Sequence, residues 1–345
     1  MYERFFALTK APFSLVPDPD CIHLTAQHAD AISGLAFGIL ERKGYLVLTA
    51  EAGLGKTTAL RALSQLLSES NADASVIFAP TLTASEFLEL VMLNFGLKDV
   101  PVSKAQRFKM LERLFLRSDA EGKVMALIVD EAHRLSPELL EEVRLLGNFE
   151  TASRKLLQIV LVGQNQLNDQ LNLPELSQLK QRIAVRLSLR PLDREGVQEY
   201  IRFRWGKAGG SDPAPFSAAA LEAIAAWSSG IPRLINVICD NALLIAFSET
   251  THDVNVKIVR DACEELSLPT PMTARSSPSF AGARPLTHQA DQPLPGPGDA
   301  ANRQPPQDVW AEFRPSLLQR LLRRSPSRER RRTRSRTGIL SLNEP

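Results

Sequence analysis

The sequence predicts an α/β fold in which a parallel sheet carries helices on both faces, followed by a small all-helical domain and a disordered tail. Segments with strand patterns alternate with segments with helical patterns over residues 1–190, as is typical of a parallel sheet. Residues 191–268 contain only helical patterns. Residues 269–345 hold 12 of the 23 prolines and few aliphatic side chains. They therefore cannot bury enough apolar surface to offset the entropy of folding, and we expect disorder.

The N-terminal segment is apolar but irregular. Phe5, Phe6 and Phe13 stand close to several prolines. We expect these rings to lie in a hydrophobic core or against a bound ligand. A helix is expected from residue 26 to residue 42, with Thr25 as its N-cap.

A glycine-rich segment, residues 49–58, lies between a strand and a helix. The apolar run 44–48 predicts the strand, and apolar residues at helical spacing over 59–67 predict the helix. This order is the one that a phosphate-binding loop requires, although Ala50 replaces the first glycine of the strict pattern. We expect Ala50 to be extended, because a left-handed alanine would cost about 1–2 kcal/mol.

The chemistry of this loop predicts ATP and Mg²⁺ as cofactors. Gly53 and Gly55 permit tight turns that bring main-chain amides to an anion, and the helix N-terminus adds further donors. Lys56 supplies a charge to the β and γ phosphates, and the Thr57 hydroxyl binds magnesium. The candidate nucleotide-binding residues of the loop are Glu51, Ala52, Gly53, Leu54, Gly55, Lys56, Thr57 and Thr58. The phenylalanines before the loop would then lie in the core or against the base.

Four further segments extend the predicted sheet and its helices. Residues 74–79 predict a strand, and residues 83–94 and 103–116 predict helices. Residues 124–129 form a continuous apolar run, which is typical of a central parallel strand buried on both faces.

Two carboxylates follow this central strand, where an open α/β sheet binds its ligands. Asp130 is the candidate magnesium ligand, and Glu131 is the candidate base that orients and polarises the attacking water. The alternative is that the acidic pair merely begins the next helix. We expect His133 to be a structural or gating hydrogen-bonding group, because no other histidine lies at metal-ligand spacing.

Polar and basic residues mark the end of the first domain. Residues 156–163 predict a further buried strand, and Gln164 at its end is a candidate sensor of the γ-phosphate, with an ordinary turn as the alternative. Arg182 and Arg186 flank the start of the last strand. Either arginine could neutralise the transferring phosphoryl group from a neighbouring subunit, or form a solvated salt bridge.

The helical domain is expected to consist of four helices, residues 193–207, 217–228, 232–247 and 254–266. The third helix follows a glycine turn and has a proline in its first turn, and Arg233 stands beside that proline. An arginine so placed can reach the γ-phosphate when the helical domain closes over the sheet. The alternative is that Arg233 faces solvent.

Charge and cysteine content separate the tail from the rest. Residues 269–345 contain 13 Arg, no Lys and 6 acidic residues, a net charge of +7, whereas the preceding residues carry −5. The arginine-rich run 328–336 could bind nucleic acid, and residues 317–324 could form an amphipathic helix on an anionic membrane; a solubilising tail is the alternative. Three widely spaced cysteines, no leader pattern and no apolar run near 18 residues predict a cytoplasmic protein without a membrane span, with a peripheral position at the inner membrane as the alternative.

Residues 1–268 resemble the AAA+ ATPases of the general secretion pathway protein A (ExeA-like) group. The motifs that carry the resemblance are Phe5-Phe6 with Pro12-Phe13-Ser14-Leu15 and Pro17-Asp18-Pro19, the phosphate loop, Val129-Asp130-Glu131-Ala132-His133, Leu161-Val162-Gly163-Gln164, Leu179-Lys180-Gln181-Arg182-Ile183 and Gly230-Ile231-Pro232-Arg233. The resemblance implies ATP-driven homo-oligomerisation, with Arg182 as the finger that acts on a neighbouring subunit and Arg233 as the second sensor.

The resemblance also implies a function. We expect an ATP-hydrolysing enzyme that assembles or energises envelope machinery for secretion, pili or exopolysaccharide export. The membrane span and the periplasmic peptidoglycan-binding domain that such proteins often carry are not expected here. An ATP-dependent DNA-binding regulator of the transposition type is the alternative, and a scaffold that binds nucleotide without hydrolysis is a third candidate.

Overall fold

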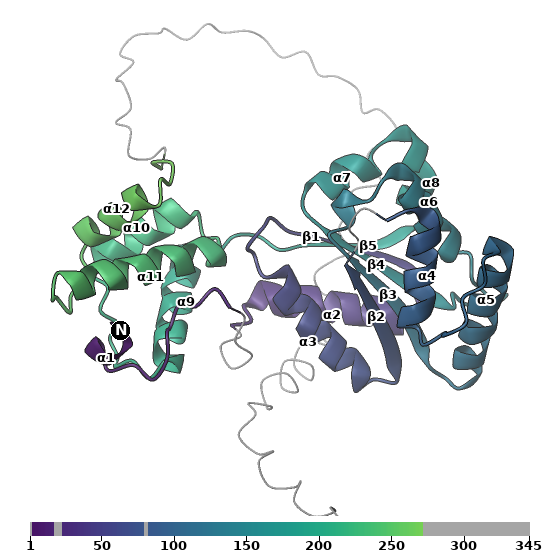
Figure 1. The fold of residues 1–345 in the computed structure, drawn as a ribbon, viewed down its shortest axis with the longest axis horizontal. Helices are drawn as coiled ribbons and strands as arrows, with labels where there is room; N and C mark the ends of the chain where they lie inside the picture. Colours follow the sequence, from purple (N-terminus) through teal and green to yellow (C-terminus); the bar gives the residue numbers. More distant parts are fainter. Residues whose placement is uncertain (1, 17–22, 79–81, 272–345) are drawn as a thin grey trace, which may run out of the picture.

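A computed structural model describes residues 2–16, 23–78 and 82–271, which form two lobes (Figure 1). The sheet lobe extends from α2 (Ala26–Leu40) to β5 (Ile183–Ser188). The helical lobe contains α1 (Tyr2–Phe5) and the helices from α9 to α12.

Within the described residues, five parallel strands form the sheet, in the order β2-β3-β4-β1-β5. The strands are β1 (Tyr45–Thr49), β2 (Ala72–Phe78), β3 (Val124–Asp130), β4 (Leu157–Gly163) and β5 (Ile183–Ser188). The three central strands, β3, β4 and β1, are buried along their whole length, because both of their faces are covered. The predicted parallel sheet is confirmed.

Helices cover both faces of this sheet (Figure 1). Leu127 of β3 belongs to the hydrophobic core shared with α4, α5 and α6, whereas the next residue, Ile128, belongs to the core shared with α2 and α3. This alternation follows from the two-residue period of a strand. The helices of the sheet lobe are α2 (Ala26–Leu40), α3 (Lys56–Ser68), α4 (Ala84–Asn94), α5 (Lys104–Ala120), α6 (Pro137–Leu146), α7 (Gln166–Leu171) and α8 (Ser177–Arg182), with short 3-10 turns η2 (Ala132–Arg134) and η3 (Pro174–Leu176).

The helix starts follow the local chemistry of the chain. The Thr25 side chain accepts a hydrogen bond from the His28 amide and caps α2, as predicted. Thr83 and Glu86 form a reciprocal capping box at the start of α4. Ala50 is not among the residues with positive φ, in agreement with the expected extended conformation.

The helical lobe has its own hydrophobic core, to which the N-terminal segment contributes. Its larger helices are α9 (Arg194–Lys207), α10 (Ala218–Ser228), α11 (Pro232–Ser248) and α12 (Val256–Glu265). Phe6 and Phe13 are buried in this core, and Phe5 packs against its edge. Although the sequence suggests grouping this segment with residues up to 190, its aromatic side chains lie among α9, α11 and their neighbours.

Arg204 of α9 holds the N-terminal segment on the helical lobe. Its Nε donates to the Pro12 carbonyl at 2.6 Å, and its second terminal nitrogen donates to the Ser14 carbonyl at 3.0 Å. The Thr9 amide also donates to the Ala208 carbonyl at the end of α9. These contacts carry residues 14–16 to the space between the lobes.

The expected tail lies outside the described residues, apart from residues 269–271. None of the helices in the described part of the chain combines the length and the hydropathy that a bilayer crossing requires.

Candidate functional site

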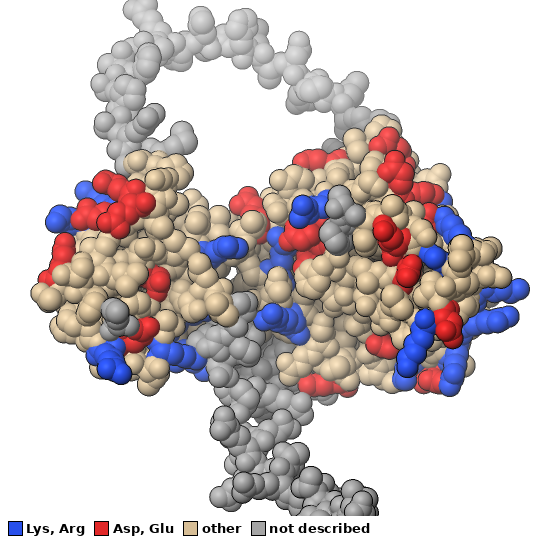
Figure 2. Space-filling model, in the orientation of Figure 1, with Lys and Arg blue, Asp and Glu red and all other residues tan. Residues whose placement is uncertain are grey.

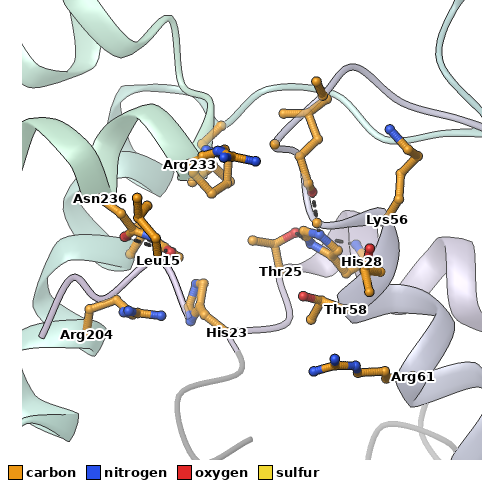
Figure 3. A pocket seen from close by; sticks show the side chains of 18 of the residues that line it. Leu15, His23, Thr25, His28, Lys56, Thr58, Arg61, Arg204, Arg233 and Asn236 are labelled. Carbon is orange, nitrogen blue, oxygen red and sulfur yellow. Dashed lines mark hydrogen bonds between the residues drawn. The ribbon is translucent and has the colours of Figure 1, made fainter. Parts of the chain in front are cut away.

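A cavity of about 410 Å³ lies where the two lobes face each other. This volume is in the range of pockets that bind small molecules, roughly 300–1,000 Å³. Figure 3 shows Lys56, Thr58 and Arg61 on the side of the sheet lobe, and Arg233 and Arg204 on the side of the helical lobe. Among the described residues that line it, Lys56, Arg61, Arg204 and Arg233 are cationic, and Glu131 is the single acidic residue. In Figure 2, basic side chains are visible between the lobes.

The glycine-rich segment forms the floor of the cavity. Gly53 and Gly55 have φ values of +85° and +92°, a conformation that side chains other than glycine rarely adopt. The Gly55 position is the N-cap of α3 and provides no side chain that could occupy the first amides of that helix. The helix N-terminus therefore presents free N–H donors and the positive end of its dipole, which favours an anion.

Lys56 and Thr57 stand at the start of α3, and both line the cavity. The Lys56 side chain is 7% exposed, and its Nζ donates to the main-chain carbonyls of Ala50 at 3.1 Å and Glu51 at 3.4 Å. Its charge is therefore held beside the loop. The other loop residues predicted to bind nucleotide also line the cavity, except Glu51, which is exposed and contributes only its carbonyl to the Lys56 contact.

Asp130 and Glu131 lie at the end of β3, with different surroundings. The Asp130 side chain is buried, and its Oδ1 accepts the Glu131 amide at 2.8 Å. Burial raises the pKa of Asp130, and the nearby Lys56 charge acts in the opposite direction. Glu131 lines the cavity and has a φ of +54°, a strained conformation of the kind that occurs at functional sites.

Arg233 lies at the start of α11, in contact with the phosphate-binding loop. Its amide donates to the Gly53 carbonyl at 3.4 Å, and its side chain points into the cavity (Figure 3). A Cβ atom added at Gly53 would lie 2.8 Å from the Arg233 Cβ and 3.0 Å from the Ile231 side chain. Glycine at this position therefore allows the helical lobe to approach the loop.

The oxygen groups at the site fit magnesium. The Thr57 hydroxyl and the Asp130 carboxylate are the hard oxygen ligands that this ion prefers. Among the described residues, no cluster of three or more metal-ligating side chains is present. Mg²⁺ is commonly held by one or two protein groups together with substrate phosphates and water.

Comparison with known proteins places this geometry in a family. Residues 39–171 match the family model described as an AAA domain. The chain is 41% identical over 258 residues to general secretion pathway protein A of Aeromonas hydrophila. The aligned region covers 74% of this chain and 46% of that protein, so the chain spans about half the length of this curated relative. The chain belongs to the AAA+ ATPase family of general secretion pathway protein A.

Solved structures show the same fold. The chain is similar to the ORC2 protein of Aeropyrum pernix, with a TM-score of 0.55, 18% identity and coverage of 77% of this chain and 75% of that chain. It is also similar to the Drosophila ORC bound to DNA, with a TM-score of 0.58, 21% identity and coverage of 78% and 66%. At these identities the likeness establishes the AAA+ fold and nothing finer.

Besides Glu51, three residues predicted for the site, Asp130, Gln164 and Arg182, are not among those that line the cavity. Gln164 follows β4, the strand between β3 and β1. Its main-chain amide donates to Nδ1 of His133 at 3.3 Å. Arg182 precedes β5, the neighbour of β1, and lies at the N-terminal end of the parallel strands, whereas the phosphate-binding loop follows the C-terminal end of β1; Ile183 pairs with Tyr45 at the start of β1. Its guanidinium donates to the Asn148 side chain at 2.6 Å. Arg182 therefore stands apart from the cavity of its own chain.

The alternative finger, Arg186, lies within β5. It is partly buried, and its guanidinium is 3.5 Å from the side-chain oxygen of Asn168. Burial lowers the pKa of Arg186. Its side chain thus contacts α7 of its own subunit, and it does not line the cavity.

The sequence did not predict that His28 and Arg204 would line this AAA+ cavity. His28 is buried, with Nε2 at 3.0 Å from the Leu54 carbonyl and Nδ1 at 2.8 Å from the Thr25 hydroxyl. It therefore ties the start of α2 to the phosphate-binding loop. The Thr25 cap indicated the helix start, but no local pattern relates position 28 to position 54.

Proposed function

We propose that this AAA+ protein binds MgATP in the cavity between its lobes and hydrolyses it to ADP and phosphate. The observation that carries the proposal is that one cavity is lined by Lys56, Glu131 and Arg233. Three different elements supply these residues, and each side chain has a defined task in phosphoryl transfer.

The phosphate-binding side of the cavity positions the triphosphate. The amides around Gly53 and Gly55 surround the phosphate oxygens, and Lys56 turns from the loop carbonyls to the β and γ phosphates. Thr57 and Asp130 would hold Mg²⁺, which would neutralise charge on the phosphates.

Glu131 of the sheet lobe and Arg233 of the helical lobe complete the reaction site. Glu131 accepts a hydrogen bond from the attacking water and orients it toward the γ-phosphate. Arg233 reaches the γ-phosphate from the helical lobe and senses whether it is present. Gln164, which follows β4 and does not line the cavity, is the second proposed sensor. Residues 14–16, carried by the helical lobe, form the wall beside the nucleoside.

Two substitutions test this function. Lys56→Ala is expected to abolish MgATP binding, because it removes the charge that faces the phosphates. Glu131→Gln is expected to bind MgATP and to lose turnover, because the amide cannot act as a base. Lys98→Ala, at an exposed lysine outside the cavity, is the matched control and should bind and hydrolyse ATP as the wild type does. Steady turnover by Glu131→Gln at the wild-type rate would refute the assignment of the base.

We further propose that the chain acts as a homo-oligomer. Arg182 stands at the end of the strands opposite to its own cavity, so a neighbouring subunit can receive it. There it neutralises charge on the transferring phosphoryl group. We keep the predicted division into residues 1–190 and 191–268, except that residues 2–16 pack with the second unit.

The role that we propose is assembly or energising of envelope machinery for secretion, pili or exopolysaccharide export. The support is the 41% identity to general secretion pathway protein A. A cytoplasmic location, with peripheral attachment to the inner membrane, fits this role. Co-purification of envelope proteins with the Glu131→Gln variant in the presence of ATP, and not with Lys56→Ala, is the expected result.

A DNA-binding regulator of the transposition type is the second candidate, favoured by the net charge of +7 in residues 269–345. If six to ten arginines of the tail contact DNA phosphates, affinity should fall roughly 10³- to 10⁵-fold between 50 and 200 mM salt. Deletion of residues 314–336 should then abolish duplex-stimulated ATPase activity. Salt-independent affinity, or stimulation that survives the deletion, would exclude this candidate.

A further inference from the structure

His133 lies between the end of β3 and the end of β4. It belongs to the short turn η2 (Ala132–Arg134), and its side chain is 12% exposed. Its main-chain nitrogen would lie 3.1 Å from a Cβ atom added at Gly163, the last residue of β4. The absence of a side chain at Gly163 therefore allows the turn to rest directly on the end of that strand.

The ring of His133 has two polar neighbours at a single nitrogen. Nδ1 accepts a hydrogen bond from the Gln164 amide at 3.3 Å. The same Nδ1 is 3.4 Å from Oε2 of Glu131. Among the described residues, His133 is the one basic side chain within ion-pair distance of the Glu131 carboxylate.

These neighbours make opposite demands on Nδ1. The amide needs an unprotonated nitrogen, whereas the carboxylate needs an N–H donor. The distance of 3.4 Å to Glu131 exceeds the roughly 2.7–2.9 Å of a charge-assisted hydrogen bond, so the amide holds the nitrogen in the described arrangement. If the end of β4 moves toward a γ-phosphate, the main-chain amide of Gln164 moves away from Nδ1 of His133. The other neutral tautomer can then donate from Nδ1 to Glu131.

We propose that His133 is a positioning residue that transmits the position of the β4 end to the base Glu131. This rests on the proposed function, in which Glu131 orients water. The carboxylate of Glu131 is 37% exposed and stands on a left-handed residue, so a neighbouring donor restricts its rotation. A displacement of about 1 Å at a reacting group can cost about 10²-fold in rate. Since the contact of His133 is with the base Glu131, we expect its loss to slow turnover and to leave nucleotide binding unchanged.

Three substitutions at one position test the proposal. An asparagine places its amide where Nδ1 of histidine lies, and a glutamine reaches the position of Nε2. His133→Ala and His133→Gln should each lower kcat by about 10- to 100-fold. His133→Asn should keep kcat within about threefold of the wild type, and the affinity of every variant for a fluorescent ATP analogue should stay within about twofold. Arg134→Ala, at an exposed residue of the same turn, is the control that should retain the wild-type kcat.

The outcomes separate this proposal from the one on which it rests. Equal kcat for His133→Asn and His133→Gln, wild-type kcat for His133→Ala, or a loss of affinity equal to the loss of kcat would each overturn the positioning role. These results would leave ATP hydrolysis through Glu131 intact. Absence of turnover in the wild type, or full turnover by Glu131→Gln, would instead overturn both proposals.

Discussion

Replacing Gly53 with alanine should separate the helical lobe from the phosphate-binding loop. At a φ of +85°, an alanine costs about 1–2 kcal/mol in backbone strain. Its Cβ would also lie 2.8 Å from the Arg233 Cβ, and such overpacking costs about 1–3 kcal/mol. The lobes can relieve the overpacking by moving apart, which withdraws Arg233 from the γ-phosphate. The loss of a charged hydrogen bond of about 1.5–3 kcal/mol predicts an ATP affinity about 10- to 100-fold weaker.

The matched control is Gly96→Ala. Gly96 has a φ of +81°, and a Cβ atom added there would meet nothing within 4 Å. This variant therefore has the same backbone strain without the contact. Its melting temperature should fall by about 2–8 °C, while its ATP affinity, measured by calorimetry, should match that of the wild type. Wild-type affinity in Gly53→Ala, or an equal loss in Gly96→Ala, would refute the proposed contact between Gly53 and the helical lobe.

Three further predictions concern a buried histidine, a buried arginine and the subunit interface. Burial lowers the pKa of His28 below its usual 6.5, so the unfolded chain binds more protons than the folded chain as the pH falls below that value. In urea titrations, the free energy of unfolding should therefore fall more steeply below pH 6.5 for the wild type than for His28→Gln, and parallel curves would contradict this. Arg204→Ala leaves the Pro12 and Ser14 carbonyls without their donors and should lower the free energy of unfolding by about 1–3 kcal/mol for each, with faster proteolysis of residues 2–16; unchanged urea unfolding would contradict this. Mixing equal amounts of inactive Arg182→Ala and inactive Lys56→Ala should restore about a quarter of the wild-type ATPase rate, because an interface is active only where one subunit keeps Lys56 and its neighbour keeps Arg182. No recovery on mixing would argue against an Arg182 finger.

Local chemistry made much of the fold predictable from the sequence. The continuous apolar run that ends at Asp130 predicted a strand buried on both faces, and the structure has it at the centre of the sheet. The Thr25 cap predicted the start of one helix, and for another the sequence offered Ser85 or Thr83, of which the structure has Thr83 as the cap. The positions of the glycine-rich loop and of the two carboxylates were predictable for the same reason, because each motif is short and follows a strand end.

Contacts between distant parts of the chain were not predictable in this way. Phe13 has no local signal that distinguishes the core of the helical lobe from the sheet, since burial of an aromatic ring satisfies either one. Arg204 is one of several arginines on α9, and its burial depends on two carbonyls about 190 residues earlier. The position of Gln164 behind His133 likewise depends on how β3 and β4 pair.

The attachment of the N-terminal segment to α9 has a mechanical consequence. Residues 2–16 pack on the helical lobe, α2 to β5 form the sheet lobe, and α9 to α12 belong to the helical lobe again. Two covalent tethers therefore join the lobes. Two covalent connections should limit the rotation of the helical lobe relative to the sheet lobe to one axis, which passes through both connections. Cutting the chain before α2 would remove this restriction.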